Sequence, residues 1–336
     1  MSVLLVLGVG TVSWALTGWF RRYAIARRLL DVPNARSSHA VPTPRGGGLA
    51  VAASATCAFS LLAVGGILPW PLFWALVGGG TLAAVVGFID DHGHVPPKWR
   101  LLGHVGGAAW ILLCLGGPPA VSIFGFTLLP GPTSSVLLLL YVVWLLNLTN
   151  FMDGIDGLAA VETITVSIGG ALLYTTVAGS TPWVAPLVMA GAAAGFLVWN
   201  WPPAMIFLGD AGSGFIGIVL ATLSLQAAGV AAPLFWSWVI LLGVFIVDAT
   251  LTLGRRMLRG ERFYEAHRTH AYQQATRGRS HAAVTLTVCA INLAWLFPLA
   301  VLVAKGTLDG ALGVVIAYAP LMAAAWWLEA AVASRP

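Results

Sequence analysis

Long apolar stretches separated by short polar segments run through almost the whole chain. Each apolar stretch is close to the roughly 20 residues that an α-helix needs to cross the hydrocarbon core of a bilayer. The pattern predicts eleven membrane-spanning helices, at residues 2–20, 47–66, 71–89, 101–117, 133–149, 159–178, 183–200, 212–230, 233–253, 283–303 and 308–330. We therefore expect an all-α integral membrane protein in which residues 1–336 form a single polytopic domain.

The composition agrees with this interpretation. Hydrophobic residues make up 59% of the chain and charged residues only 9%, whereas roughly 25% of the residues in a soluble domain are charged. The three cysteines, Cys57, Cys114 and Cys289, all lie inside apolar stretches. They are expected to pack as small hydrophobic side chains and not to form disulfides or a metal site.

Charged residues are distributed unequally between the two sets of loops that alternate across the membrane. One set comprises residues 21–46, 90–100, 150–158, 201–211 and 254–282. It carries fifteen of the 17 lysine and arginine residues and six of the seven histidines, and the seventh, His104, lies a few residues beyond the second of these loops. Basic residues favour the cytoplasmic side, so we place these loops in the cytoplasm and the N-terminus outside. Most carboxylates lie in the same loops or at their edges, which predicts one active site on the cytoplasmic face.

The third of these loops has the highest density of amides and carboxylates. The segment Asn147-Leu-Thr-Asn-Phe-Met-Asp-Gly-Ile-Asp-Gly157 separates two apolar stretches. Asn150, Asp153 and Asp156 are each three residues apart, so they would share one face if the segment were helical. Burying such groups unpaired would cost several kcal/mol each. They therefore form either a capped helix start or a site for a polar ligand, and both interpretations can hold together.

Two further carboxylate positions lie at the ends of apolar stretches in neighbouring loops. Asp90 and Asp91 are adjacent at a membrane border, which is costly unless they bind a cation or a proton; pairing with Lys98 and Arg100 is the alternative. Asp210 lies where a helix is predicted to begin, and helix N-termini favour anions. A carboxylate beside an anion site suggests a bridging Mg²⁺, which binds through one or two carboxylates and substrate phosphates. The alternative is that Asp210 only caps its helix.

The first and last loops are rich in basic residues. Arg45 is followed by three glycines, which would let the backbone approach a ligand closely. Arg268 lies between His267 and His270. Arginine and backbone N–H groups suit phosphate. Anchoring to anionic lipid headgroups is the alternative for both loops, and for the first loop the sequence does not decide between them.

Four motifs in these loops resemble those of a known family. They are Asp90-Asp91, Asn150-Phe-Met-Asp-Gly-Ile-Asp-Gly157, Phe207-Leu-Gly-Asp-Ala-Gly-Ser213 and Ala266-His-Arg-Thr-His-Ala-Tyr-Gln273, in the family's order and in alternate loops. The chain resembles the polyprenyl-phosphate N-acetylhexosamine-1-phosphate transferases, glycosyltransferase family 4, which include MraY, WecA and WbpL. MraY-type enzymes carry three consecutive histidines where this chain has His267-Arg-Thr-His270. That departure argues against a muramyl-pentapeptide substrate and favours the WbpL-like branch, which initiates O-antigen, lipopolysaccharide or related cell-envelope glycans.

The resemblance implies a reaction and a set of roles. In such an enzyme of the bacterial inner membrane, a sugar-1-phosphate passes from a UDP-N-acetylhexosamine to undecaprenyl phosphate and UMP is released. Mg²⁺, or Mn²⁺ in its place, is the implied cofactor, and a homodimer is plausible by resemblance; no nucleic-acid partner is expected. The implied metal ligands are Asp210 and Asn150; the catalytic residues are Asp90, Asp91, Asp153, Asp156, His267 and His270; and the substrate- or phosphate-binding residues are Arg45, Lys98, Arg100, Asn147, Arg268 and Ser213.

Three other functions are alternatives to the sugar-1-phosphate transferase. A muramyl-pentapeptide (lipid I) transferase is the nearest. A transporter would place its polar groups near the membrane midplane, in broken helices of repeated halves, whereas here they lie at one edge. An intramembrane aspartyl protease would use two aspartates such as Asp153 and Asp210 but would leave the arginine and histidine loops unexplained. Dependence on a divalent metal separates the transferase from the protease.

Overall fold

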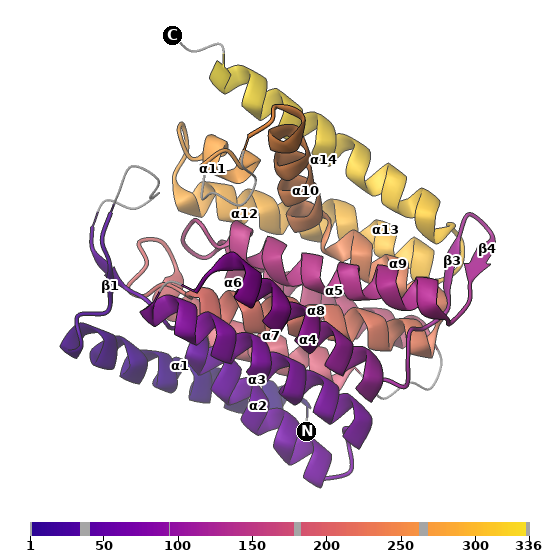
Figure 1. Ribbon diagram of the computed structural model, residues 1–336, viewed down its shortest axis with the longest axis horizontal. Helices are drawn as coiled ribbons and strands as arrows, with labels where there is room; N and C mark the ends of the chain where they lie inside the picture. The colour runs from indigo at the N-terminus through magenta and orange to yellow at the C-terminus, as the bar shows by residue number, and fades with distance from the viewer. Residues whose placement is uncertain (1, 34–40, 94, 178–182, 262–267, 334–336) are drawn as a thin grey trace.

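The computed structural model describes residues 2–33, 41–93, 95–177, 183–261 and 268–333. These residues form a bundle of helices with two short hairpins (Figure 1). The helices are α1 (Ser2–Ala26), α2 (Gly48–Val64), α3 (Trp70–His92), α4 (Pro97–Cys114), α5 (Pro132–Met152), α6 (Leu158–Leu173), α7 (Val184–Asn200), α8 (Asp210–Val230), α9 (Ala232–Leu241), α10 (Gly243–Leu258), α11 (Ala271–Ala275), α12 (His281–Ile291), α13 (Phe297–Ala304) and α14 (Gly310–Ala333). Strands β1 (Leu30–Asp31) and β2 (Thr43–Pro44) pair antiparallel, as do β3 (Val121–Ile123) and β4 (Phe126–Leu128).

Each of the eleven predicted apolar stretches contains a helix, but fewer of them qualify as full membrane spans. Seven helices in the described part of the chain are long and apolar enough to cross a bilayer, or eight if α9 and α10, bent by 69°, count as one span. Helices α2 and α7 have 17 residues each. At 1.5 Å per residue they reach only about 25 Å, less than the roughly 30 Å of hydrocarbon. The all-α prediction is confirmed in the main, with the two hairpins as additions.

Helix α8 is the centre of the bundle, because most of its residues are buried. Glycines bring its neighbours into close contact, as small residues do between helices in membranes. A Cβ on Gly87 of α3 would lie 2.3 Å from the backbone oxygen of Asp210, and one on Gly217 would lie 2.8 Å from Cα of Leu146 in α5. The first turn of α8 is thereby packed against the last turns of α3, which places Asp210 beside the Asp90–Asp91 pair.

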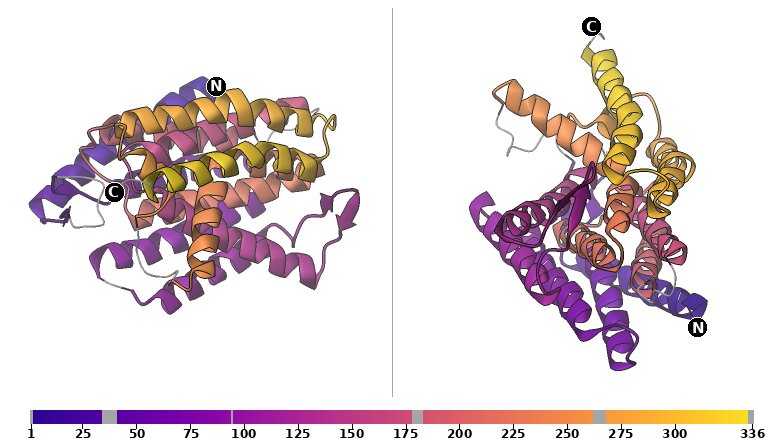
Figure 2. Two further views of the ribbon diagram at one scale, coloured as in Figure 1. Left: turned by 90° about the horizontal axis from the view of Figure 1, so that it is seen from above. Right: turned by 90° about the vertical axis from the view of Figure 1, so that its right-hand side faces the viewer.

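The polar loops gather at one end of the bundle. Figure 1 shows β1 and α11 at the left end of the molecule and the β3–β4 hairpin at the right end. Helix α10 turns away from the long axis of the bundle and projects to one side of it, as the right-hand view of Figure 2 shows. The described parts of the predicted loop set therefore lie together, as expected. They are β1–β2, the ends of α3 and α5, the start of α8, and α11.

Candidate active site

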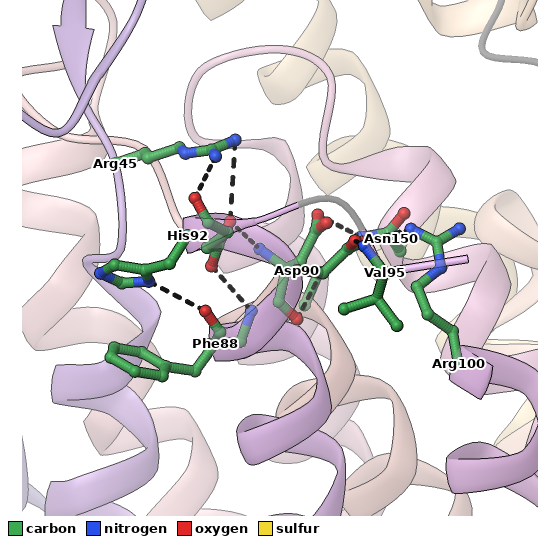
Figure 3. A network of polar contacts seen from close by, with 11 residues as sticks. Arg45, Phe88, Asp90, His92, Val95, Arg100 and Asn150 are labelled. Atoms are coloured by element: carbon green, nitrogen blue, oxygen red, sulfur yellow. Dashed lines mark hydrogen bonds and ion pairs between the residues drawn. The ribbon is translucent and has the colours of Figure 1, made fainter. Parts of the chain in front are cut away.

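A small cavity at this end of the bundle brings together five of the predicted site residues. Its lining includes Asp90 from α3, Arg100 from α4, Asn147 and Asn150 from α5, and Asp210 from α8. Figure 3 shows Asp90 between two arginines, with Arg45 on one side and Arg100 on the other, and with Asn150 close to its carboxylate. Residues that lie more than a hundred positions apart in the sequence thus face one small space.

Asp210 is held by the amide of Asn150. The Nδ2 group of Asn150 donates to Oδ1 of Asp210 at 2.7 Å and to Oγ of Ser213 at 3.0 Å. Because the amide nitrogen is used in this way, the oxygen of the same amide remains as the group of Asn150 that can bind a cation. Asn150 from one motif and Asp210 and Ser213 from another thus form one hydrogen-bonded unit.

Asp90 is the second carboxylate of the cavity, and only 7% of its side chain is exposed. It forms an ion pair with Arg100 and accepts a hydrogen bond from the backbone N–H of Val95 at 2.9 Å. The pairing with Arg100 that the sequence offered as an alternative is therefore present. Lys98 does not take part, since it is exposed and its ammonium group lies 5.6 Å from the ring centre of Trp99.

Asp91 has a different environment from Asp90. Its carboxylate accepts hydrogen bonds from the backbone N–H groups of Asp210 and Ala211, at 3.1 and 3.2 Å, and lies 3.8 Å from the guanidinium of Arg45. A negative charge at a helix N-terminus is stabilised by the free N–H groups and the helix dipole. Asp91 therefore caps α8 and fixes Asp210, and the catalytic role that the resemblance implies for it stays a prediction.

Asp153 and Asp156 lie in a turn, because α5 ends at Met152 and α6 begins at Leu158. The prediction that they could share one helical face is therefore wrong. Asp156 accepts from the backbone N–H of Ala204 at 3.1 Å and lies 3.3 Å from Nδ1 of His281. The hydrogen bond to Ala204 connects the third loop, residues 150–158, to the fourth, residues 201–211.

Asp153 is the carboxylate of this turn that interacts with the rest of the cluster. Its burial raises the pKa of Asp153 well above the usual range, and the neighbouring carboxylates of Asp210, Asp91 and Asp156 raise it further. Ionised carboxylates this close to one another repel unless a cation offsets their charge. When Asp153 is ionised, it therefore increases the negative charge that a cation in the site would offset.

The last loop reaches the site through Asp248 of α10. This buried carboxylate accepts from the backbone N–H groups of Ala271 and Tyr272, both at 2.9 Å, and lies 3.2 Å from Nδ1 of His270. Tyr272 in turn donates its hydroxyl to the backbone oxygen of Phe151 at 2.9 Å, and burial raises the pKa of this phenol. His270 and the start of α11 are thus fixed against the third loop. Arg268 precedes this network, and His267 lies outside the described residues.

Sequence reasoning did not assign Asp248, Tyr272 or His281 to the site. Asp248 lies inside the predicted 233–253 stretch, where an ionisable residue is costly and usually functional, so the sequence does carry a signal for it. Tyr272 belongs to the fourth motif but was given no role there. His281 gives no such signal, because its role depends on a contact between segments that the sequence does not place together.

The donor atoms at the site fit a divalent cation. The described residues contain no group of three His, Cys, Asp or Glu side chains arranged as a complete metal site. Mg²⁺, however, usually binds through one or two carboxylates and takes its other ligands from water and phosphate. The carboxylate of Asp210 and the amide oxygen of Asn150 are oxygen ligands of this kind, and such an ion would relieve the repulsion among the buried carboxylates.

The fold and this cluster define a class of protein: a polytopic membrane protein with one carboxylate- and arginine-lined site at one end of its bundle, suited to phosphorylated substrates. Residues 73–228 match the model of glycosyl transferase family 4. The chain is 30% identical over 318 residues to the decaprenyl-phosphate N-acetylglucosaminephosphotransferase of Mycolicibacterium smegmatis, covering 85% of this chain and 78% of that protein. It is 28% identical over 306 residues to a probable undecaprenyl-phosphate N-acetylglucosaminyl 1-phosphate transferase of Bacillus subtilis, with 86% and 81% covered.

A third relative covers less of the chain. The phospho-N-acetylmuramoyl-pentapeptide-transferase of Streptococcus mutans is 34% identical over 211 residues, which cover 54% of this chain and 58% of that protein. This chain belongs to the polyprenyl-phosphate N-acetylhexosamine-1-phosphate transferase family, glycosyl transferase family 4. It is accordingly a membrane-bound transferase.

Proposed function

We propose that this protein transfers N-acetylhexosamine-1-phosphate from a UDP-sugar to undecaprenyl phosphate, with release of UMP, as the first step of a cell-envelope glycan. The observation that carries the proposal is the cavity in which Asp90, Arg100, Asn150 and Asp210 meet, in a chain whose relatives bear the names of such transferases. The proposal places the site on the cytoplasmic face of the bacterial inner membrane and the N-terminus in the periplasm, because the basic loops lie at the end where the cavity is found.

The proposed reaction does not need a strong general base from the protein. An oxygen of the acceptor phosphate attacks the phosphorus that carries the sugar, the bond from this phosphorus to the bridging oxygen breaks, and UMP leaves. A phosphate monoester has a second pKa of about 6, so the attacking oxygen is already ionised at neutral pH. Asp90, which is paired with Arg100, then has the task of holding that guanidinium beside the acceptor phosphate.

Bringing two anionic substrates together is the main difficulty of this reaction. A divalent cation held by Asp210 and Asn150 would bind the diphosphate of the donor and offset negative charge as it develops. Arg100 and Arg45 supply positive charge from the protein itself. His270, which is fixed by Asp248, lies where α11 meets the third loop and is proposed to contact the donor.

The choice of sugar is also a proposal. The sequence His267-Arg-Thr-His270 differs from the three consecutive histidines of muramyl-pentapeptide transferases, and the relatives with that name cover only about half of the chain. We therefore favour a simple N-acetylhexosamine, such as N-acetylglucosamine, N-acetylfucosamine or N-acetylquinovosamine, over a muramyl-pentapeptide. O-antigen or lipopolysaccharide synthesis is the pathway proposed for the product.

UMP release by the purified protein tests the reaction. We expect release only with undecaprenyl phosphate, Mg²⁺ and one member of a panel of UDP-N-acetylhexosamines that includes UDP-N-acetylmuramyl-pentapeptide, and none with EDTA. Restoring activity with Mn²⁺ after EDTA would show how selective the metal site is. Turnover that continues in EDTA, or that requires no lipid acceptor, would overturn the proposal.

Addition of Mg²⁺ is expected to stabilise the folded protein, and more at pH 8 than at pH 5. Because the pKa of Asp153 is raised in the folded state, ionising this group costs stability as the pH rises above the unfolded value of about 3.9. The metal offsets that cost only where the carboxylates are ionised. At 100 times its dissociation constant a ligand stabilises by about 2.7 kcal/mol. Melting curves with Mg²⁺ or EDTA at both pH values, at constant ionic strength, measure this; an equal shift at both would contradict it.

A further inference from the structure

A second cavity, larger than the one at the active site, lies between α10, α11, α12 and α14. Its volume is about 450 Å³, within the range of cavities that hold small ligands. We call it the α10–α14 cavity; its lining includes Val247, Gln274, Val288, Leu321 and Ala325. These elements meet at the upper left of Figure 1, at the end of the bundle where α11 lies. None of the predicted site residues in the described part of the chain lines it.

The walls on three sides of this cavity are apolar. Val247 of α10, Val288 of α12, and Leu321 and Ala325 of α14 contribute aliphatic side chains. Water gains no hydrogen bonds in a cavity of this kind. In a membrane protein the abundant molecule that can fill such a space is a lipid, whose acyl chain is itself hydrocarbon.

One end of the cavity carries positive charge. Arg277 and Arg279, in the turn between α11 and α12, line it and are exposed, and no carboxylate among the described residues forms an ion pair with either of them. The carboxylate on the wall, Asp248, is already occupied by the N–H groups of Ala271 and Tyr272. The charge at this end therefore matches an anionic headgroup.

A buried acceptor lies on the wall as well. Gln274 has only 7% of its surface exposed, and its Nε2 group donates to the backbone oxygen of Arg268 at 3.0 Å. Its Oε1 atom, in contrast, accepts no hydrogen bond within the described part of the chain. A buried acceptor without a donor costs roughly 1–3 kcal/mol, so a rotation of the Gln274 amide that brings Oε1 to a ligand hydroxyl would remove that cost.

We propose that the α10–α14 cavity binds an anionic phospholipid with a hydroxyl-bearing headgroup, of the phosphatidylglycerol class. One acyl chain fills the apolar part and the phosphate lies at Arg277 and Arg279. The amide of Gln274 turns toward the cavity, so that a headgroup hydroxyl donates to its Oε1 atom. This lipid is distinct from the polyprenyl phosphate acceptor, and the proposal does not depend on the transfer reaction.

The cavity is connected to the active site through its own wall. Asp248 and Tyr272 line it, and the same two residues fix His270 and the backbone of Phe151 in the site. A lipid that packs against this wall would restrict the movement of α11. The bound phospholipid would therefore help to keep His270 in position, so that the membrane composition affects the enzyme.

Native mass spectrometry of the full-length protein with phosphatidylglycerol or phosphatidylcholine tests the proposal. We expect the wild-type protein to retain phosphatidylglycerol in preference to phosphatidylcholine. Arg277→Ala combined with Arg279→Ala should weaken that binding roughly 30-fold, since each basic side chain near an anionic surface contributes about one kcal/mol. Ala325→Trp should weaken it as well, because the indole fills the cavity without changing any charge.

A matched control distinguishes this cavity from general attraction of basic residues to lipid. Arg22→Ala combined with Arg27→Ala removes two exposed arginines, one in the last turns of α1 and one directly after this helix, and should leave the binding unchanged. Equal retention of both lipids by the wild type, or unchanged binding in both the double arginine variant and Ala325→Trp, would overturn the proposal. Displacement of the phospholipid by undecaprenyl phosphate would assign the cavity to the acceptor and overturn it too. Because the readout is binding, a failed transfer assay does not affect the result.

Discussion

Asp210→Asn is expected to abolish transfer, lowering the rate by at least about 10³-fold, while the protein stays folded. A bound metal supplies several kcal/mol of stabilisation to charge in the transition state, and about 1.4 kcal/mol corresponds to a factor of ten in rate. Asparagine keeps an oxygen that can accept from Nδ2 of Asn150, as Oδ1 of Asp210 does at 2.7 Å. It also removes one of several neighbouring negative charges, so the melting temperature should not fall.

The measurement is UMP release by the variant beside its melting curve with and without Mg²⁺. Asp309→Asn is a matched control, because Asp309 precedes α14 and accepts from the backbone N–H of Leu312 at 3.0 Å but is exposed and far along the chain from every motif of the site. We expect normal turnover from this control. Normal turnover from Asp210→Asn would remove the metal role from this residue.

Asp248→Asn is expected to slow transfer roughly 10- to 100-fold, the usual loss when the partner that orients a functional side chain is changed. Both carboxylate oxygens of Asp248 accept: one from the N–H of Ala271, the other from the N–H of Tyr272, and His270 lies beside the first. An amide can offer only one of its two ends as an acceptor. The other end would meet a backbone N–H group donor to donor, so His270 and α11 would shift.

A double-mutant cycle shows whether Asp248 acts through His270. His270→Ala alone should slow transfer by orders of magnitude, and adding Asp248→Asn to it should cost little more, because the residue being oriented is gone. Thr252→Val is the control, and it should slow transfer less than Asp248→Asn does. Thr252 donates to Asp248 at 3.2 Å, so its replacement removes only one of the contacts of Asp248. Losses that multiply fully in the double variant would give Asp248 a role in stability alone. A wild-type rate for His270→Ala would return the last loop to lipid anchoring.

Much of the architecture could be predicted from the sequence because membrane proteins follow simple rules. A backbone in lipid must satisfy its own hydrogen bonds, so every long apolar stretch became a helix. The alternation of basic and non-basic loops correctly grouped Asp90, Asn150 and Asp210, which meet in one cavity. Four motifs in family order led to the same transferase family that the comparisons show.

The remaining features depend on geometry between segments. Successive residues of a helix point about 100° apart, so the sequence does not reveal that Asp90 faces the cavity while Asp91 caps α8. The 233–253 stretch reads as one uniform apolar run, so it does not reveal the 69° bend between α9 and α10, both of which pack against the distant helix α14. Asp153 and Asp156 would share one face if their segment were helical, but the segment is a turn, in which Gly157 has a φ of 77° that favours glycine.

The cap that Asp91 places on α8 has a consequence for the biogenesis of the protein. Its partners, the N–H groups of Asp210 and Ala211, are synthesised 119 and 120 residues later. Until α8 has entered the membrane, the Asp90–Asp91 pair lies at the membrane border without these donors, where a carboxylate is costly. A chain that stops before residue 210 therefore keeps the Asp91 carboxylate without these donors. Membrane quality-control proteases of the cell are expected to degrade such fragments faster than the full-length protein.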